Sequence, residues 1–222
     1  MLSSTVEDYV KRLFFEQAAA GEGQMVPMGK LAAAMSVTPG TATSMGKTLA
    51  DLGLAEYEPR MGVRLSPEGE KLALKMLRRH RLIERLLVDI LGLDWSEVHE
   101  EAEQLEHVIS DKVLDRIDAL LGHPTSDPHG DPIPTAKGHM AQPAATSLAE
   151  CAVEMPLRIA RVVDQDPLFL QFAHRHGLTP GAIVTVTQRD DIAAAVTLLR
   201  EAQPELFTLG THAAAKIMVE PA

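Results

Sequence analysis

Apolar residues recur at helical spacing through the first half of the chain. A stripe at i, i+3, i+4 and i+7 predicts a helix over residues 5–20, which Gly21-Glu22-Gly23 ends. A shorter helix is expected over 28–35. Thr38 followed by Pro39 is the signature of a helix N-cap with proline at the first position, and the helix that it begins runs over 41–52. Two short helices joined by a tight turn match helix-turn-helix spacing.

The hydrophobic period changes after Gly53. Residues 54–58 and 63–65 form two short strand-like runs around the turn 59–62, which predicts a hairpin. A hairpin directly after a helix-turn-helix is the wing of a winged helix. Pro67 then opens a long helix over about 67–91.

The remainder of the chain predicts one more long helix and then strands. Gly92 ends the preceding helix, and the next runs from Asp94 to about Leu121 with a continuous apolar stripe. Residues 122–147 hold five of the fourteen prolines and no sustained period, which indicates irregular structure. Beyond Val153, the short strands and one helical piece predict a small barrel: strands 157–163, 183–187, 194–198 and 215–219, and a helix at 167–176. The fold class is therefore mainly α with a small β domain.

Composition narrows the class of protein. Hydrophobic residues make up 45% of the 222, and no apolar run approaches the length of a membrane span. The N-terminus has neither a basic nor an apolar segment of a secretory signal, so a cytoplasmic protein is expected. A single cysteine, Cys151, excludes an intrachain disulfide and a Cys-based zinc site.

Charge is spread unevenly along the chain. The net charge is −10, yet residues 1–85 hold 12 Lys and Arg against 10 Asp and Glu. All of the acidic excess lies in 86–222. The mildly basic segment 1–85 favours binding of phosphates, and the acidic segment 86–222 favours binding of cations.

Histidines and carboxylates gather between residues 80 and 107. His80 and Glu84 are four residues apart on one helix, and His99, Glu103 and His107 follow at successive steps of four on the next. Such pairs on a surface helix usually form only a weakly interacting solvated face. The full set, without thiolates, favours a site for Mn²⁺, Fe²⁺, Co²⁺ or Zn²⁺.

These residues also carry a family resemblance, which covers essentially the whole chain. The sequence resembles the diphtheria toxin repressor family of metal-dependent transcriptional regulators, in the manganese-responsive branch that has a C-terminal SH3-like (FeoA-type) domain. The most specific stretches are Arg79-His80-Arg81-Leu82-Ile83-Glu84-Arg85-Leu86-Leu87, Glu97-Val98-His99-Glu100-Glu101-Ala102, Glu106-His107-Val108-Ile109-Ser110-Asp111 and Asp131-Pro132-Ile133-Pro134.

The resemblance implies three domains and a linker. It places a winged helix-turn-helix DNA-binding domain at 1–73, a helical metal-binding and dimerisation domain at 74–140, a linker at 141–152 and the SH3-like domain at 153–222. The apolar stripe over 98–120 is the expected dimer seam.

The resemblance also implies two separated metal sites per chain. The ancillary site maps onto His80, Glu84 and His99, completed by a barrel residue for which Asp166 is the candidate, with Asp164 and Gln165 left open. The regulatory site maps onto Asp8, Glu103, Glu106 and His107. The iron-responsive branch has Met and Cys at the first two positions, whereas the manganese-responsive branch has Asp and Glu. Exchange of sulfur for carboxylate ligands shifts preference toward Mn²⁺.

Other residues receive simpler interpretations. Lys11 replaces a carboxylate of barrel-less manganese regulators, which disfavours a closely spaced dinuclear site. Histidines outside the two sites are assigned no metal role, namely His123, His129, His139, His174, His176 and His212. Hydroxyl and basic groups of the recognition helix and wing are the candidates for DNA contacts, namely Thr38, Thr41, Thr43, Ser44, Lys47, Arg60 and Arg64.

The function implied is a homodimeric repressor that binds palindromic double-stranded operator DNA when Mn²⁺ is bound and controls metal-homeostasis genes. No membrane or small-molecule substrate is expected. Alternatives are an iron-dependent repressor of the same fold, a metalloenzyme that uses the carboxylate/histidine cluster, and a metal carrier. The sequence shows no nucleophile–base pair and no H-E-x-x-H motif, so the protein is not expected to be an enzyme.

Overall fold

The computed structural model describes residues 2–21, 23–141, 144–201 and 203–222. Residues 142 and 143 of the predicted linker and Glu22 of the predicted helix stop lie outside the described residues. The chain divides into two compact units, residues 1–79 with 134–140, and residues 80–133 with 141–222.

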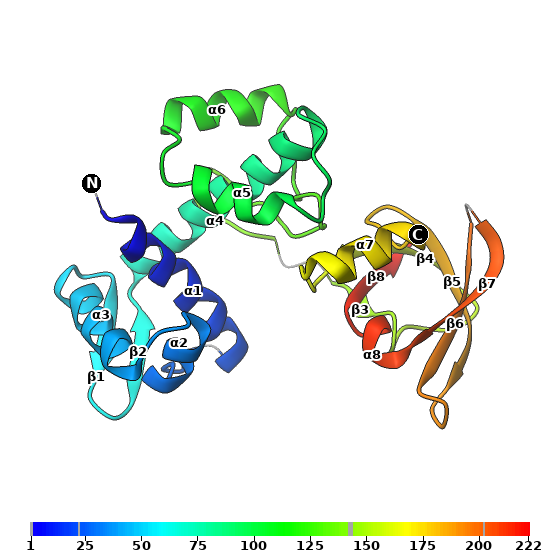
Figure 1. The fold of residues 1–222 in the computed structure, drawn as a ribbon, viewed down its shortest axis with the longest axis horizontal. Helices are drawn as coiled ribbons and strands as arrows, with labels where there is room; N and C mark the ends of the chain where they lie inside the picture. Colours follow the sequence, from blue (N-terminus) through cyan, green and yellow to red (C-terminus); the bar gives the residue numbers. More distant parts are fainter. Residues whose placement is uncertain (1, 22, 142–143, 202) are drawn as a thin grey trace. The chain divides into compact units, whose positions relative to one another are not determined.

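The described residues form the elements labelled in Figure 1. The helices are α1 (Ser4–Ala20), α2 (Met28–Ala34), α3 (Pro39–Asp51), α4 (Pro67–Asp89), α5 (Val98–Leu105), α6 (Asp111–Leu120), α7 (Pro167–Arg175) and α8 (Thr211–Ala214). The strands are β1 (Ala55–Glu58), β2 (Gly62–Leu65), β3 (Thr146–Ser147), β4 (Pro156–Val162), β5 (Ile183–Asp190), β6 (Ala195–Arg200), β7 (Gln203–Gly210) and β8 (Ile217–Pro221).

The first unit is a winged helix. Helices α1, α2 and α3 pack around Leu13, Leu31 and Leu49, all fully buried. The predicted cap of the recognition helix is confirmed, since the Thr38 hydroxyl accepts a hydrogen bond from the Thr41 N–H at the start of α3. The wing is the antiparallel β1–β2 hairpin. This unit therefore has the element order that the hydrophobic pattern predicts.

Gly69 sets the approach of α4 to the wing. A Cβ at this position would lie 1.9 Å from the carbonyl oxygen of Leu54. Alanine normally stabilises a helix relative to glycine, but here the backbone must move, so Gly69→Ala is expected to destabilise the protein by about 1–3 kcal/mol. Gly29→Ala in α2, where a Cβ meets nothing within 4 Å, is the matched control and should be neutral or stabilising. Urea unfolding of both variants checks the sign; equal stabilities would contradict the packing argument.

The single helix predicted from Asp94 to about Leu121 is wrong: the structure has two helices, α5 and α6. Ser110 separates them, because its side chain accepts a hydrogen bond from the Val113 N–H and caps α6. Ser110-Asp111 is a helix N-cap signal in the sequence, but the apolar stripe continues across it, so the pattern predicts one uninterrupted helix. His107 consequently lies in the connecting turn and not on the helix face of His99 and Glu103.

The β part of the second unit is one six-stranded sheet in the order β3-β8-β4-β5-β6-β7. Figure 1 shows the strands curling around a core that α7 covers on one side. Leu170 of α7 packs there with Ile159, Val186, Leu198 and Ile217 of the sheet. Strands β3 and β7 and the short helix α8 were not predicted. Strand β7 carries Pro204 and Glu205 within its first residues, which breaks the apolar alternation.

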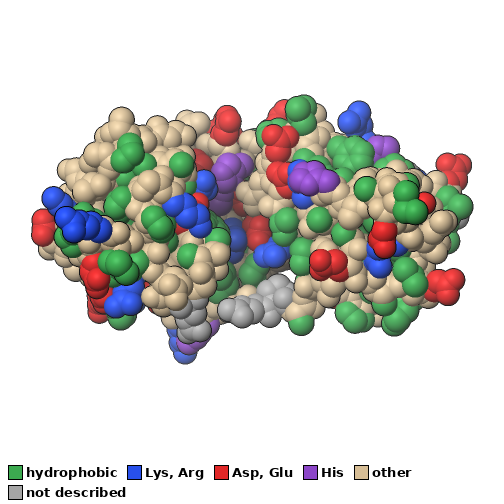
Figure 2. All heavy atoms as spheres, turned by 90° about the horizontal axis from the view of Figure 1, so that it is seen from below, with side chains coloured by type: hydrophobic (Ala, Val, Ile, Leu, Met, Phe, Trp, Pro, Cys, Tyr) green, Lys and Arg blue, Asp and Glu red, His purple; other side chains and the backbone are tan. Residues whose placement is uncertain are grey.

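No helix in the described part of the chain is both long and apolar enough to cross a membrane. On the face drawn in Figure 2, acidic and basic side chains are interspersed with apolar ones.

Candidate metal centre

His80, on α4, lies at the centre of a cluster of imidazoles and carboxylates in the second unit. Its Nδ1 is 2.7 Å from Oε2 of Glu106, and its Nε2 is 3.0 Å from Oε1 of Glu84. The same Nε2 lies 3.1 Å from Nδ1 of His99. One histidine nitrogen and two carboxylate oxygens thus converge around one buried ring.

Glu84 is held ionised although it is fully buried. Burial by itself would raise its pKa, but hydrogen bonds to His80 and His99, together with the positive charge of nearby histidines, hold the pKa of Glu84 well below its ordinary value. A buried carboxylate in this state is a strong ligand for a cation.

Glu103, Glu106 and His107 continue the cluster on α5 and in the turn after it. Oε1 of Glu103 is 3.7 Å from Nδ1 of His80 and 3.8 Å from Nε2 of His99. Nε2 of His107 is 3.8 Å from Oε1 of Glu106. His80, His99 and Glu103 present ligand atoms within 4.8 Å of one another. Residues predicted for two separated sites therefore form a continuous cluster.

The two remaining predicted ligands, Asp8 and Asp166, come from other elements of the chain. Asp8 lies on α1, in the first unit, so its role in the regulatory site stays a prediction. Asp166 is exposed and caps α7, since its Oδ1 accepts hydrogen bonds from the Leu168 and Phe169 N–H groups. Within the described residues, Asp166 belongs to none of the groups of three or more clustered ligand atoms. The neighbouring alternative Gln165 instead donates to Asp131.

The structure adds a group that the sequence interpretation missed, made of Glu84, Asp127 and His129. All three side chains are buried, with relative exposures of 1%, 1% and 0%. Asp127 and His129 come from the irregular segment after α6, where no period singles them out. The only signal in the sequence is the Asp-Pro-His-Gly-Asp turn at 127–131.

Burial raises the pKa of Asp127 well above its ordinary value, and the charges of Asp131 and Glu84 raise it further against the opposing charge of Arg81. Above the unfolded pKa of about 3.9, a carboxyl whose pKa is raised by folding ionises more readily in the unfolded chain than in the folded protein. The folded state therefore loses stability relative to the unfolded chain as the pH rises. In metal-free protein, Asp127→Asn should therefore match wild type near pH 4 and become more stable than wild type as the pH rises. Urea unfolding in chelator at several pH values checks this; a variant less stable at pH 7.5 would contradict it.

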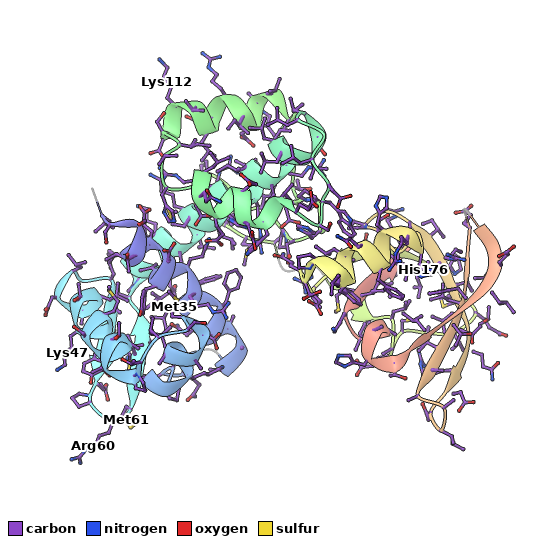
Figure 3. The ribbon with its side chains drawn as sticks, viewed as in Figure 1. Met35, Lys47, Arg60, Met61, Lys112 and His176 are labelled. Atoms are coloured by element: carbon purple, nitrogen blue, oxygen red, sulfur yellow. The ribbon has the colours of Figure 1, made fainter. Side chains whose placement is uncertain are left out.

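The predicted DNA-contact residues lie on α3 and the wing of the first unit. Figure 3 shows Lys47 pointing outward from α3, and Arg60 and Met61 pointing outward from the tip of the hairpin. Arg60 has a φ of 69°, which the tight turn requires. Arg64, by contrast, is engaged within the unit, because its Nη2 lies 2.6 Å from Oε2 of Glu56.

The hydroxyl groups of α3 are partly engaged in local hydrogen bonds. The Thr38 and Thr41 hydroxyls lie 2.9 Å apart, and the Thr43 hydroxyl donates to the Pro39 carbonyl. Thr38, Thr41, Ser44 and Lys47 are exposed. These four side chains form the accessible part of the predicted recognition helix, and Arg60 is exposed on the wing.

The donor set of the cluster fits a divalent metal ion. Imidazole nitrogens and carboxylate oxygens without sulfur suit borderline-to-hard ions such as Mn²⁺, Fe²⁺ and Zn²⁺. Buried carboxylates of this number need positive charge to stay ionised. A winged helix in the same chain as this cluster defines the class of metal-responsive DNA-binding regulators.

Comparison with known proteins identifies the family. Three family descriptions match: "Iron dependent repressor, N-terminal DNA binding domain" at residues 1–63, "Iron dependent repressor, metal binding and dimerisation domain" at 66–135, and "FeoA domain" at 146–221. An HTH-type transcriptional regulator of Methanocaldococcus jannaschii is 35% identical over 120 residues, which cover 54% of this chain and 94% of the relative. The chain therefore belongs to the iron-dependent repressor family and is a metal-dependent transcriptional repressor of that family.

Two further relatives show how much of this chain is similar to known repressors. The diphtheria toxin repressor of Corynebacterium efficiens is 48% identical over 82 residues, which cover 37% of this chain and only 36% of the relative. The solved structure of a manganese-dependent transcriptional repressor in complex with manganese is 36% identical, with a TM-score of 0.86, over 98% of this chain and 100% of that chain. The likeness to a manganese-dependent repressor thus extends through the C-terminal sheet.

Proposed function

We propose that this chain is a Mn²⁺-activated repressor that acts in the cytoplasm as a homodimer on palindromic operator DNA of metal-homeostasis genes. The carrying observation is the His80-centred cluster of imidazoles and carboxylates in a chain that also holds a winged helix. The domains proposed are DNA binding at 1–73, metal binding and dimerisation at 74–140, a linker at 141–152 and the SH3-like domain at 153–222.

Two ions per chain are proposed. His80, Glu84 and His99 hold the first, and Glu103, Glu106 and His107 together with Asp8 hold the second. Because Asp8 and Glu103 supply oxygen where an iron site would have sulfur, Mn²⁺ is preferred over Fe²⁺. Asp166 stays the proposed barrel ligand of the first ion, with its Oδ1 also capping α7.

The chain's own architecture explains how metal would affect DNA binding. Asp8 is on α1, and α1 packs against α3 through Leu13 and Leu49. A constraint on Asp8 therefore passes through a packed core to the recognition helix. The bound ion would supply positive charge that compensates the carboxylates of Asp8, Glu103 and Glu106. Palindromic half-sites require a fixed separation of two recognition helices, which such a constraint provides.

The dimer seam is proposed on the exposed part of the 98–120 stripe. Val98, Ala102 and Ile117 are buried within their own unit, and so do not contribute. Val108 and Val113 remain 76% and 49% exposed, and Leu120 is 63% exposed. Exposed apolar side chains gathered on one segment mark a protein–protein contact.

The test starts from a random pool of duplex DNA, since the operator has yet to be defined. Selection with the full chain in Mn²⁺ should enrich a palindromic sequence, and selection in chelator should enrich none. Enrichment that is equal in chelator would refute metal activation, and enrichment of no duplex in either condition would refute the DNA-binding proposal.

The choice of metal is tested by Glu103→Cys. Thiolate in place of carboxylate should weaken Mn²⁺ binding relative to Fe²⁺ by about tenfold or more, because sulfur favours the ion later in the Irving–Williams order. Anaerobic isothermal titration of metal-stripped wild type and variant with both ions measures the ratio. Glu101→Cys, also on α5 but exposed, is the matched control. An unchanged Mn²⁺/Fe²⁺ ratio in Glu103→Cys would contradict the assignment.

A further inference from the structure

Glu84, Asp127 and His129 form a buried group that shares Glu84 with the first metal site of the proposed function, while Asp127 and His129 belong to neither site. Each residue offers one ligand atom that lies within 4.8 Å of those of the other two. Three of their polar atoms are fully buried: Oε2 of Glu84, Oδ2 of Asp127 and Nδ1 of His129. Among the described residues, none forms a hydrogen bond with any of these three atoms. Burial of polar atoms without hydrogen bonds is costly and calls for an explanation.

Each of the three residues is fixed by bonds on its other polar atoms. Oδ1 of Asp127 accepts hydrogen bonds from the backbone N–H groups of His129 and Asp131. Oε1 of Glu84 faces His80 and His99. The polar atoms left without a hydrogen bond are Oε2 of Glu84, Oδ2 of Asp127 and Nδ1 of His129.

The tautomer of His129 follows from its partner. Its Nε2 is 2.8 Å from the carbonyl oxygen of Trp95, and a carbonyl can only accept, so Nε2 carries a proton. In the neutral ring Nδ1 then carries a lone pair and no proton, and it lies 4.0 Å from Oε2 of Glu84. A lone pair and two carboxylate oxygens packed this closely repel unless a cation or a proton lies among them.

The protein's own cations only partly supply that charge. Nε of Arg81 is 3.4 Å from Oδ2 of Asp127, but Arg81 also serves Asp131 and donates to the Pro132 carbonyl. One guanidinium is thus shared by two carboxylates.

We infer that Glu84, Asp127 and His129 form a third metal site, which takes a divalent ion of the Mn²⁺, Fe²⁺ or Zn²⁺ class. Two carboxylate oxygens and one imidazole nitrogen are ligands that such ions accept. Glu84 then serves two ions, with Oε1 on the His80 side and Oε2 on the His129 side. The ion fastens the 127–131 turn to α4. This site does not rest on the DNA-binding function proposed above, since its evidence is confined to the second unit.

The experiment counts Mn²⁺ bound per chain by equilibrium dialysis and elemental analysis. Asp127→Asn should bind one ion fewer than wild type. The variant is expected to fold, because its amide can keep the two backbone hydrogen bonds through oxygen and donate its N–H to Glu84. Asp131→Asn is the matched control: it makes the same change beside the same Arg81, but outside the three-atom group, and should keep the wild-type count. An equal count for wild type and Asp127→Asn would overturn the inference.

A second measurement uses wild type alone. Anomalous scattering from Mn²⁺-loaded crystals should show a peak enclosed by Oε2 of Glu84, Oδ2 of Asp127 and Nδ1 of His129. Peaks elsewhere in the protein with none at this position would mean that a proton on Asp127 or His129 balances the charge, and would refute the site. Loss of Mn²⁺-dependent DNA binding with this peak intact would instead refute only the proposed function.

Discussion

Replacement of His107 by alanine is expected to abolish most of the gain in DNA affinity that Mn²⁺ gives. His107 lies in the turn between α5 and α6, with its Nε2 3.8 Å from Glu106, and it contributes the only imidazole of the proposed regulatory site. Loss of a ligand should weaken metal binding by about 100-fold or more, since even indirect partners of ligands are worth 10–100-fold. DNA affinity at a fixed low concentration of Mn²⁺ should fall accordingly.

The matched control is His123→Ala. His123 is also a histidine of the helical region, but it is 72% exposed and pairs with Asp118 after the end of α6, away from the cluster. Fluorescence anisotropy with a selected duplex compares both variants with wild type. If His107→Ala binds DNA like His123→Ala at every Mn²⁺ concentration, His107 is not a regulatory ligand.

Arg81→Met is expected to produce the largest loss of stability, about 3–5 kcal/mol in metal-free protein. Arg81 is buried on α4, where it donates to the Pro132 carbonyl and forms ion pairs with Asp127 and Asp131. Methionine preserves much of the volume and removes the charge, which leaves two buried carboxylates uncompensated by it. The loss should shrink as the pH falls and Asp127, whose pKa is raised by burial, becomes protonated.

Arg85→Met, one helical turn further along α4, is the control for Arg81→Met. Arg85 pairs with Asp89 at 2.6 Å, but both side chains are about a third exposed. An i, i+4 pair of this kind contributes only about 0.3–0.5 kcal/mol. Urea unfolding in chelator measures both variants, and similar losses for the two would contradict the role assigned to the buried network.

The elements that the sequence predicts well are those whose signals are local. Thr38-Pro39 marks the start of α3, and the change of hydrophobic period after Gly53 marks the wing; both are present as predicted. The break at Ser110 was also encoded locally, but a continuous apolar stripe outweighed a single capping residue. Strand β7 was missed because its polar residues and proline interrupt the alternation on which a strand prediction depends.

The candidate site was predictable only where its residues share a helix. The i, i+4 spacing of His80 and Glu84 placed both on one face of α4, and their contact is present. Glu84 and the 127–131 turn meet through tertiary packing, which no periodicity records. Helical spacing therefore could not predict Asp127 and His129 as candidate ligands, although both are buried beside the predicted ligand Glu84.

The predicted ancillary and regulatory ligand sets are in contact with each other. His80 was predicted for the ancillary site and Glu106 for the regulatory site, yet their side chains lie 2.7 Å apart. A change in one set should therefore affect the other, and double substitutions across the sets should be non-additive.

Metal bound at the histidine and carboxylate cluster is proposed to set the affinity of the protein for DNA. The test is the fluorescence anisotropy of a selected palindromic duplex with full-length wild-type protein, over a series of free Mn²⁺ concentrations. DNA affinity is expected to rise with Mn²⁺ by at least tenfold, and added DNA is expected to tighten Mn²⁺ binding by the same factor. A DNA affinity that is the same in chelator and in saturating Mn²⁺ would refute metal control of DNA binding.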